Sequence, residues 1–110
     1  MTAEQKRHIE LTDLVLVVRG GAGALPPPGT VFSGAVGETL EEAAAYVPHG
    51  TIRFTTVGAI LAAGGLVTLE PEMTRSGKMN ERHVNVMEGS LPSVFSEPCP
   101  NPVPKQERIQ

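Results

Sequence analysis

HGTIRFTTVGAILAAGGLVTLEP, residues 49–71, carries the signals of three elements in close succession. Apolar and polar residues alternate through TIRFTT at 51–56, which predicts a half-buried strand. The apolar residues of VGAILAA at 57–63 follow helical spacing, and the two glycines after them can form the left-handed turn that ends a helix. LVTLE at 66–70 predicts a second strand, which ends at Pro71. A strand, a short helix and another strand in one stretch indicate a small domain of the α+β class.

The residues before this stretch predict further strands and one more helix. LVLVV at 14–18 is a continuous, β-branched apolar run closed by glycines, which is typical of a strand buried on both faces. Three consecutive prolines within 22–29 exclude regular structure there, and we expect a short strand at 30–33. Thr39 and Glu42 have the spacing of a capping box, which predicts the start of a helix that ends before the next proline.

The residues after the stretch alternate once more and then become rich in proline. RHVNVME at 82–88 predicts a last strand. The whole sequence predicts an α+β fold with a small mixed or mostly antiparallel sheet of four to five short strands, two short helices and an extended Pro-rich C-terminal tail. We expect a polar lead-in at 1–10, a single domain at 11–90, and a tail at 91–110 that packs on the domain or on a partner.

The composition argues against several classes of function. The 110 residues carry a net charge of −3 and no tryptophan, which argues against a basic nucleic-acid footprint and against a base-stacking platform. No apolar run approaches the roughly 20 residues of a membrane span, and the polar residues 1–10 do not resemble a secretory signal. The single cysteine, Cys99, excludes an internal disulfide and a cysteine-based zinc cluster, and we expect no metal. These features favour a cytoplasmic protein and leave delivery as an effector open.

Five residues at predicted strand ends are candidates for binding an anion or a cofactor. Arg19 could hold a phosphate or carboxylate in bidentate fashion, and Gly20 would let the ligand approach the backbone. The hydroxyls of Thr55 and Thr56, with the first free amides of the following helix, could hold an anion. His49, between a helix and a strand, could contact a ligand. Each has a structural alternative: an arginine reaching solvent, a turn, a helix cap, or a histidine at a helix end.

Polar residues in and near the last predicted strand form a second group of candidates. In an extended chain His83 and Asn85 share one face, and Glu88 follows them. If this face lines a cleft it is the most polar strand of a site, and if it faces solvent it is an ordinary amphipathic strand. Glu70 and Glu72 flank a proline, and two close carboxylates suit acid–base chemistry, although exposed glutamate pairs are common.

The order of these residues resembles small bacterial toxin-like domains with an ADP-ribosyltransferase-like fold. Arginine and two glycines close the first strand, a histidine and a glycine enter a strand that ends in two threonines, and a late strand begins with a histidine, all within 14–89. The resemblance implies an NAD-binding cleft, and it implies a cognate immunity protein or antitoxin as partner. The residues it implies for NAD binding are Arg19, Gly20, His49, Thr55 and Thr56, and those for catalysis are His83, Asn85 and Glu88. Asn85 stands where the family has a glutamate. Such a cleft requires Arg19 and His83 to point to the same face of the sheet.

Two alternatives remain open at the level of sequence. A metal-independent ribonuclease toxin needs an acid–base pair and a cation for the phosphate. The residues that could supply them are His83 or His49, Glu70 or Glu72, and Arg19 or Arg53. The net charge weighs against tight RNA binding, so nucleic acid is not the expected partner. A non-enzymatic interaction domain would use the Pro-rich segments 25–28 and 92–104 for docking. The sequence indicates no oligomeric state.

Overall fold

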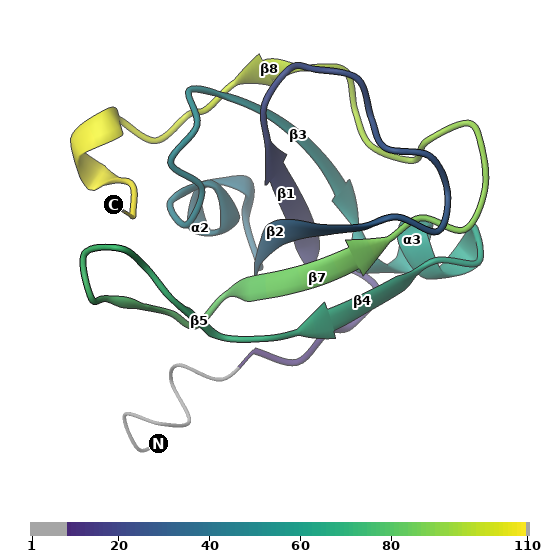
Figure 1. Ribbon diagram of the computed structural model, residues 1–110, viewed down its shortest axis with the longest axis horizontal. Coiled ribbons are helices and arrows are strands. Elements are labelled where there is room, and N and C mark those ends of the chain that lie inside the picture. Colours follow the sequence, from purple (N-terminus) through teal and green to yellow (C-terminus); the bar gives the residue numbers. More distant parts are fainter. Residues whose placement is uncertain (1–8, 110) are drawn as a thin grey trace.

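The computed structural model describes residues 9–109, which form a six-stranded sheet with short helices beside it (Figure 1). The strand order is β4–β7–β2–β1–β3–β8, and each neighbouring pair is antiparallel. The sheet strands are β1 (Leu16–Gly20), β2 (Val31–Gly37), β3 (Thr51–Thr56), β4 (Leu66–Leu69), β7 (His83–Met87) and β8 (Cys99–Pro100). A separate hairpin consists of β5 (Glu72–Met73) and β6 (Met79–Asn80), and the helices are α2 (Leu40–Ala44), α3 (Val57–Ala62) and the 3-10 helix η1 (Lys105–Glu107). Within 9–109, no helix combines the length and the apolar character that a membrane span requires.

The predicted α+β class and the two short helices are confirmed, and the sheet has more strands than the four to five expected. The additional strand is β8, which comes from the Pro-rich tail and pairs with the outer side of β3. β8 has only two residues, too few to show an alternating pattern in the sequence. Its proline is tolerated because β8 is an edge strand. The second strand also runs to Gly37 instead of ending at 33. The sequence did not predict this extension, because most of its last residues are small and carry little β-propensity.

Threonine side chains begin both α-helices. Thr39 Oγ1 accepts a hydrogen bond of 3.1 Å from the amide of Glu42, whose carboxylate in turn accepts one of 2.9 Å from the amide of Glu38. Thr56 Oγ1 accepts a hydrogen bond of 3.1 Å from the amide of Ala59. The helix starts therefore follow from local sequence.

The sheet buries apolar residues on both faces, which we name after the helix that covers each. The α3 face contains Val17, Val36, Val84, Val86, Val57, Ile60 and Phe95. The α2 face contains Val18, Ala35, Ala43, Ala44, Val47 and Ile52. Val17 and Val18 are both fully buried and point to opposite faces, as expected for a central strand.

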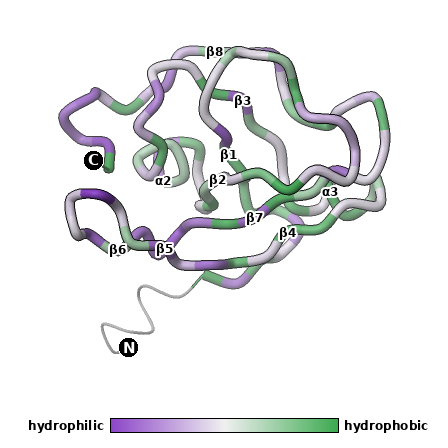
Figure 2. The backbone as a smooth tube through the Cα atoms, viewed as in Figure 1, coloured by the Kyte–Doolittle hydropathy of each residue, from purple (hydrophilic) through white to green (hydrophobic). Residues whose placement is uncertain are grey.

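The C-terminal segment, residues 91–109, lies along the edge of the sheet. Ser96 exchanges two hydrogen bonds with the backbone of Phe54 on β3, of 3.0 and 2.8 Å, and Phe95 is buried. The chain then forms β8 and continues past α2 to η1 (Figure 1). Hydrophilic residues are concentrated in η1 and in the β5–β6 hairpin, whereas the inner strands are mostly hydrophobic (Figure 2). These hydrophilic segments lie at the same end of the molecule.

Candidate functional site

A cavity of about 330 Å³ opens on the α2 face, between the start of β7, the end of β1, the segment after α2, the β5–β6 hairpin and the C-terminal segment. It is lined by Gly20, Ser33, Gly34, Tyr46, Val47, Pro48, His49, Glu72, Thr74, Arg75, Asn80, His83 and Ile109. A concave, partly apolar pocket with a few convergent polar groups is the usual form of a small-molecule site. We call it the two-histidine pocket, after His49 and His83.

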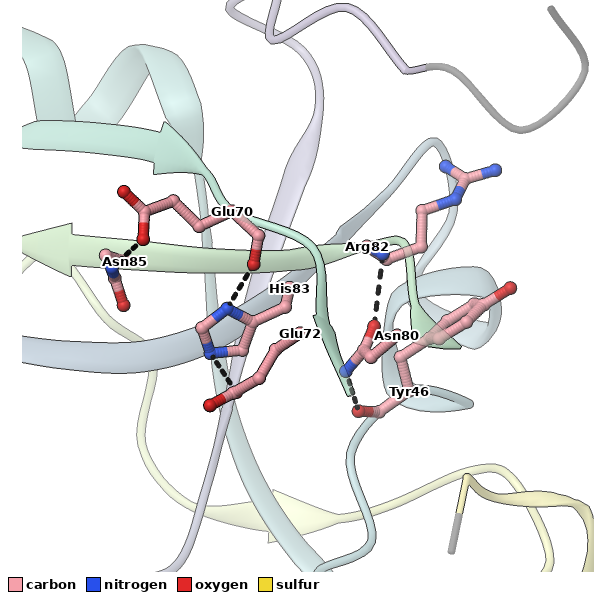
Figure 3. Close-up of polar contacts among 7 residues, drawn as sticks. All are labelled: Tyr46, Glu70, Glu72, Asn80, Arg82, His83 and Asn85. Carbon is pink, nitrogen blue, oxygen red and sulfur yellow. Dashed lines mark hydrogen bonds and ion pairs between the residues drawn. The ribbon is translucent and has the colours of Figure 1, made fainter. Parts of the chain in front are cut away.

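His83 is the buried polar centre of this pocket, with 8% of its surface exposed. Its Nδ1 lies 2.7 Å from the carbonyl oxygen of Glu70, and because a carbonyl can only accept, Nδ1 must carry a proton. Nε2 lies 3.0 Å from Oε2 of Glu72, close enough for an ion pair but not aligned as a hydrogen bond (Figure 3). The atom of the ring that can gain or lose a proton is therefore the one that faces the carboxylate.

The connection between β4 and the hairpin places both partners of His83. The amide of Glu70 donates a hydrogen bond of 2.8 Å to the carbonyl of His83, and the carbonyl of Glu70 accepts from the His83 ring. Pro71 then interrupts the ladder, and Glu72 begins β5 with its carboxylate beside Nε2. The carboxylate of Glu70 points elsewhere and accepts a hydrogen bond of 2.9 Å from Asn85. Glu72, and not Glu70, is the acidic residue of the pocket.

His49 approaches the pocket from the segment between α2 and β3. Its imidazole lies over the backbone of Gly20, so closely that a Cβ at residue 20 would overlap the ring. The ring is exposed and has no hydrogen-bond partner within residues 9–109. Gly20 is thus required for space, and Nδ1 is the ring atom of His49 that lies nearest to it.

Arg75 adds a cationic group at the tip of the hairpin, where it is exposed and lines the pocket. Asn80 is already engaged: its amide bonds the carbonyl of Tyr46 at 3.5 Å and its oxygen accepts from the amide of Arg82 at 3.1 Å (Figure 3). No three His, Cys, Asp or Glu side chains within the described part of the chain are grouped to hold a metal ion. The pocket offers two imidazoles, one carboxylate and one guanidinium for proton transfer and anion binding.

The α3 face carries a different polar cluster. Arg19 on β1 lies directly opposite Arg53 on β3, and the Arg19 guanidinium is 4.6 Å from the centre of the Phe32 ring. Nη1 of Arg19 and Nε of Arg53 are both buried without a hydrogen-bond partner. Burial, and then the positive charge of Arg53, lower the pKa of Arg19, while Glu88 raises it. Glu88 itself is 6% exposed and accepts hydrogen bonds of 2.9 Å from Ser93 Oγ and from the amide of Val94.

The structure does not form the one cleft that the resemblance implies. Val18 pairs with Ala35 and Ala35 pairs with His83, so these three side chains point to the α2 face. Arg19 follows Val18 on the same strand and therefore points to the α3 face. The expectation that Arg19 and His83 share a face is wrong, because the register across three strands fixes their relative direction.

The sequence-predicted residues divide between the two faces. Gly20, His49 and His83 meet in the two-histidine pocket. Arg19, Thr55 and Glu88 belong to the α3 face, and Thr55 is buried there. Thr56 caps α3, and Asn85 is bound to Glu70 outside the pocket.

No protein-family model, curated protein or solved structure matches the chain.

The sequence alone did not point to Arg75 and did not separate Glu72 from Glu70. Arg75 was not a candidate, because the polar TRSG stretch at 74–77 predicts a turn and gives no indication of its function. Glu72 was a candidate only as one of a pair of glutamates. The signal that separates them is the intervening proline, which ends the strand and redirects the second carboxylate.

Proposed function

We propose that the two-histidine pocket is an acid–base site that cleaves RNA phosphodiester bonds without a metal ion. The observation that carries this proposal is the contact of 3.0 Å between His83 Nε2 and Glu72, in a pocket that also contains His49 and Arg75. A histidine whose Nδ1 is fixed by a carbonyl, and whose Nε2 faces a carboxylate, is arranged to exchange a proton with that carboxylate.

RNA carries its own nucleophile, so the protein has to supply only proton transfer and charge stabilisation. A base removes the proton of the 2′-hydroxyl as the 2′-oxygen forms its bond to phosphorus. An acid protonates the 5′-oxygen as the bond between phosphorus and that oxygen breaks, which leaves a 2′,3′-cyclic phosphate and a 5′-hydroxyl. Glu72, whose exposed carboxylate lies against the buried Nε2 of His83, is the proposed base, and His83 stabilises the proton that Glu72 takes up. His49 is the proposed acid, and Arg75 the cation that stabilises the phosphorane.

The two imidazoles, the carboxylate and the guanidinium of the pocket fit RNA cleavage better than cleavage of NAD. Nicotinamide leaves as a neutral molecule, so breaking its glycosidic bond requires no proton donor. A pocket with two imidazoles suits a reaction in which one proton is removed and another is delivered. The proposed function therefore rests on the number and type of proton-carrying groups that line the pocket.

The negative net charge restricts the substrate to a short contact. Within the described residues, Arg75 is the only lysine or arginine that lines the pocket. An extended duplex would require many phosphate contacts, whereas a single-stranded segment needs only one nucleotide to enter the cavity. A toxin of this type would need a neutralising protein in the cell that makes it, and an immunity protein or antitoxin that covers the pocket would serve.

The direct experiment incubates the full chain with a short, labelled, single-stranded oligoribonucleotide in EDTA. A matched substrate that carries a 2′-deoxyribose at every position is the control, because it lacks the internal nucleophile. The proposal expects cleavage of the RNA alone, with cyclic phosphate at the new 3′ end. Cleavage of both substrates, or a requirement for added metal, would contradict it.

A second candidate function is supported by the α3 face. Arg19 and Arg53 lie side by side near the buried Glu88, and each has one buried nitrogen without a hydrogen-bond partner. Arg53 also donates hydrogen bonds of 3.3 and 3.4 Å to the carbonyls of Ser96 and Gly23, and paired arginines suit a pyrophosphate. This set includes Arg19, Thr55 and Glu88, three of the residues that the ADP-ribosyltransferase resemblance assigns to NAD and catalysis, but His83 lies on the opposite face, so a site here would have to act without it. Its test is release of nicotinamide from NAD by the wild-type chain and by Arg19→Ala. Release that is lost in the variant would place the activity on the α3 face.

A further inference from the structure

The segment that carries His49 is held in place by two side chains from the C-terminal segment, Asn101 and Arg108. Arg108 Nη1 donates one hydrogen bond of 3.3 Å to the carbonyl of Pro48, and Asn101 makes the remaining contacts. The amide nitrogen of Asn101 lies 3.2 Å from the carbonyl of Ala44, 3.2 Å from that of Val47 and 3.0 Å from that of His49. The backbone amide of Asn101 donates a further bond of 2.9 Å to the carbonyl of Gly50. Asn101 is 9% exposed. One residue therefore contacts the backbone from the end of α2 to the start of β3.

These contacts replace hydrogen bonds that the segment cannot make for itself. The last carbonyls of a helix have no partner within it, and α2 has only five residues. The segment's own bonds run from the amides of Tyr46 and Val47 to the carbonyls of Ala43 and Ala44, both 3.1 Å long, and stop short of His49. Among the side chains of residues 9–109, that of Asn101 donates the hydrogen bond to the backbone carbonyl of His49.

The side chain of Asn101 is itself fixed from behind. Its oxygen accepts a hydrogen bond of 2.9 Å from the amide of Val103, which orients the amide group toward the segment after α2. Beyond it, the amide of Ile109 donates a bond of 2.8 Å to the carbonyl of Ala45, and Ile109 lines the pocket. The C-terminal segment thus anchors one wall of the two-histidine pocket and forms part of another.

We infer that Asn101 is a positioning residue that fixes the imidazole of His49 in the pocket. Gly20 limits the ring from the side of the sheet, and Asn101 holds its backbone from the opposite side. Without the side-chain amide of Asn101, the carbonyl of His49 loses its hydrogen bond, although Arg108 still bonds the carbonyl of Pro48, and the ring leaves its place over Gly20. The role in catalysis rests on the proposed function, whereas the placement of His49 does not.

The test replaces Asn101 by aspartate, which removes both N–H donors and keeps the oxygen that accepts from Val103. Gln106→Glu is the matched control, because it makes the same chemical change at an exposed position of the same segment. The Cε1–H signals of His49 and His83 are followed by NMR at constant pH. We expect the His49 signal to shift or split in Asn101→Asp, and the His83 signal to stay in place. A folded variant with an unchanged His49 signal, or with equal changes at both histidines, would overturn the inference.

A second variant covers the case in which Asn101→Asp does not fold. Asn101→Ser adds no charge and keeps one donor, so a smaller shift of the His49 signal is expected. The kinetic arm measures cleavage of the oligoribonucleotide, where loss of positioning should lower kcat about tenfold or more and leave KM within about twofold. If no variant and no wild-type chain cleaves RNA, the proposed function fails while the NMR arm still decides the role of Asn101.

Discussion

Nε2 of His83 lies 3.0 Å from the carboxylate of Glu72, although the His83 side chain is only 11% exposed and that of Glu72 is 64% exposed. The contact joins a buried ring, fixed by β7 and the carbonyl of Glu70, to a carboxylate at the rim of the pocket. The buried imidazole and the exposed carboxylate therefore form one acid–base pair, of which Glu72 is the member that a ligand can reach. This relationship leads to the first prediction.

Glu72→Gln should lower the rate of RNA cleavage about a hundredfold or more, because an amide cannot take up the proton of the 2′-hydroxyl. Stability should change by no more than about 1 kcal/mol, since the contact has one exposed partner. Steady-state kinetics and a thermal melt measure the two effects. Glu97→Gln is the control, because Glu97 is exposed and remote from the pocket residues. Equal loss in both variants would mean that only overall charge matters.

Gly20→Ala should damage the pocket more than the fold. The new methyl group would occupy the place of the His49 imidazole, and an exposed ring can swing away at a cost of about 1 kcal/mol or less. Cleavage should fall by about a hundredfold, because the ring is displaced from the substrate. Gly23→Ala is the matched control, since nothing lies within 4 Å of a Cβ there. Full activity of Gly20→Ala would show that the position of His49 is irrelevant.

The affinity for single-stranded RNA should depend weakly on salt. Each phosphate contact to a single strand contributes a slope of about −0.7 to log K against log salt concentration. Because Arg75 is the one described lysine or arginine in the pocket, the expected slope is about −0.7. Fluorescence anisotropy at several salt concentrations measures it with an inactive variant. A slope of about −4 or steeper would require a basic surface outside this pocket.

Arg19→Met should not destabilise the protein. Burial and Arg53 lower the pKa of Arg19, so the folded state holds this proton less tightly than the unfolded state and the charge opposes folding. That unfavourable contribution is present below the folded pKa and disappears above it. Since arginine titrates far above neutrality, the effect of the variant on Tm should be the same from about pH 5 to 8. Methionine retains contact with Phe32, so we expect an equal or higher Tm. A fall of more than about 4 °C would contradict this.

The local parts of the fold were accessible from sequence. Thr39 and Thr56 begin helices because their hydroxyls reach amides three residues ahead, which depends on neighbouring residues alone. The strand predicted at 14–18 lies at Leu16–Gly20: Val17 and Val18 are fully buried, as expected for a strand buried on both faces, whereas Leu14 precedes it and is 85% exposed. β8 was missed, because a two-residue edge strand depends on its partner β3 and on no pattern of its own.

The candidate site was only partly accessible, because its geometry depends on the register between distant strands. Alternation within one strand shows that neighbouring side chains diverge, but it cannot show that Arg19 and His83 diverge. That result needs the pairing of Val18 with Ala35 and of Ala35 with His83. The overlap of His49 with Gly20 and the bonds from Asn101 are likewise contacts between segments far apart in sequence.

The measurement that tests the central claim most directly compares wild type with His83→Gln in the cleavage of a single-stranded oligoribonucleotide in EDTA. Glutamine keeps a polar group in the cavity but cannot share a proton with Glu72. The account predicts cyclic-phosphate products with the wild type and a rate about 10² to 10⁴ times lower with a folded variant. Cleavage at the same rate by both chains, or no cleavage by the wild type, would contradict the account.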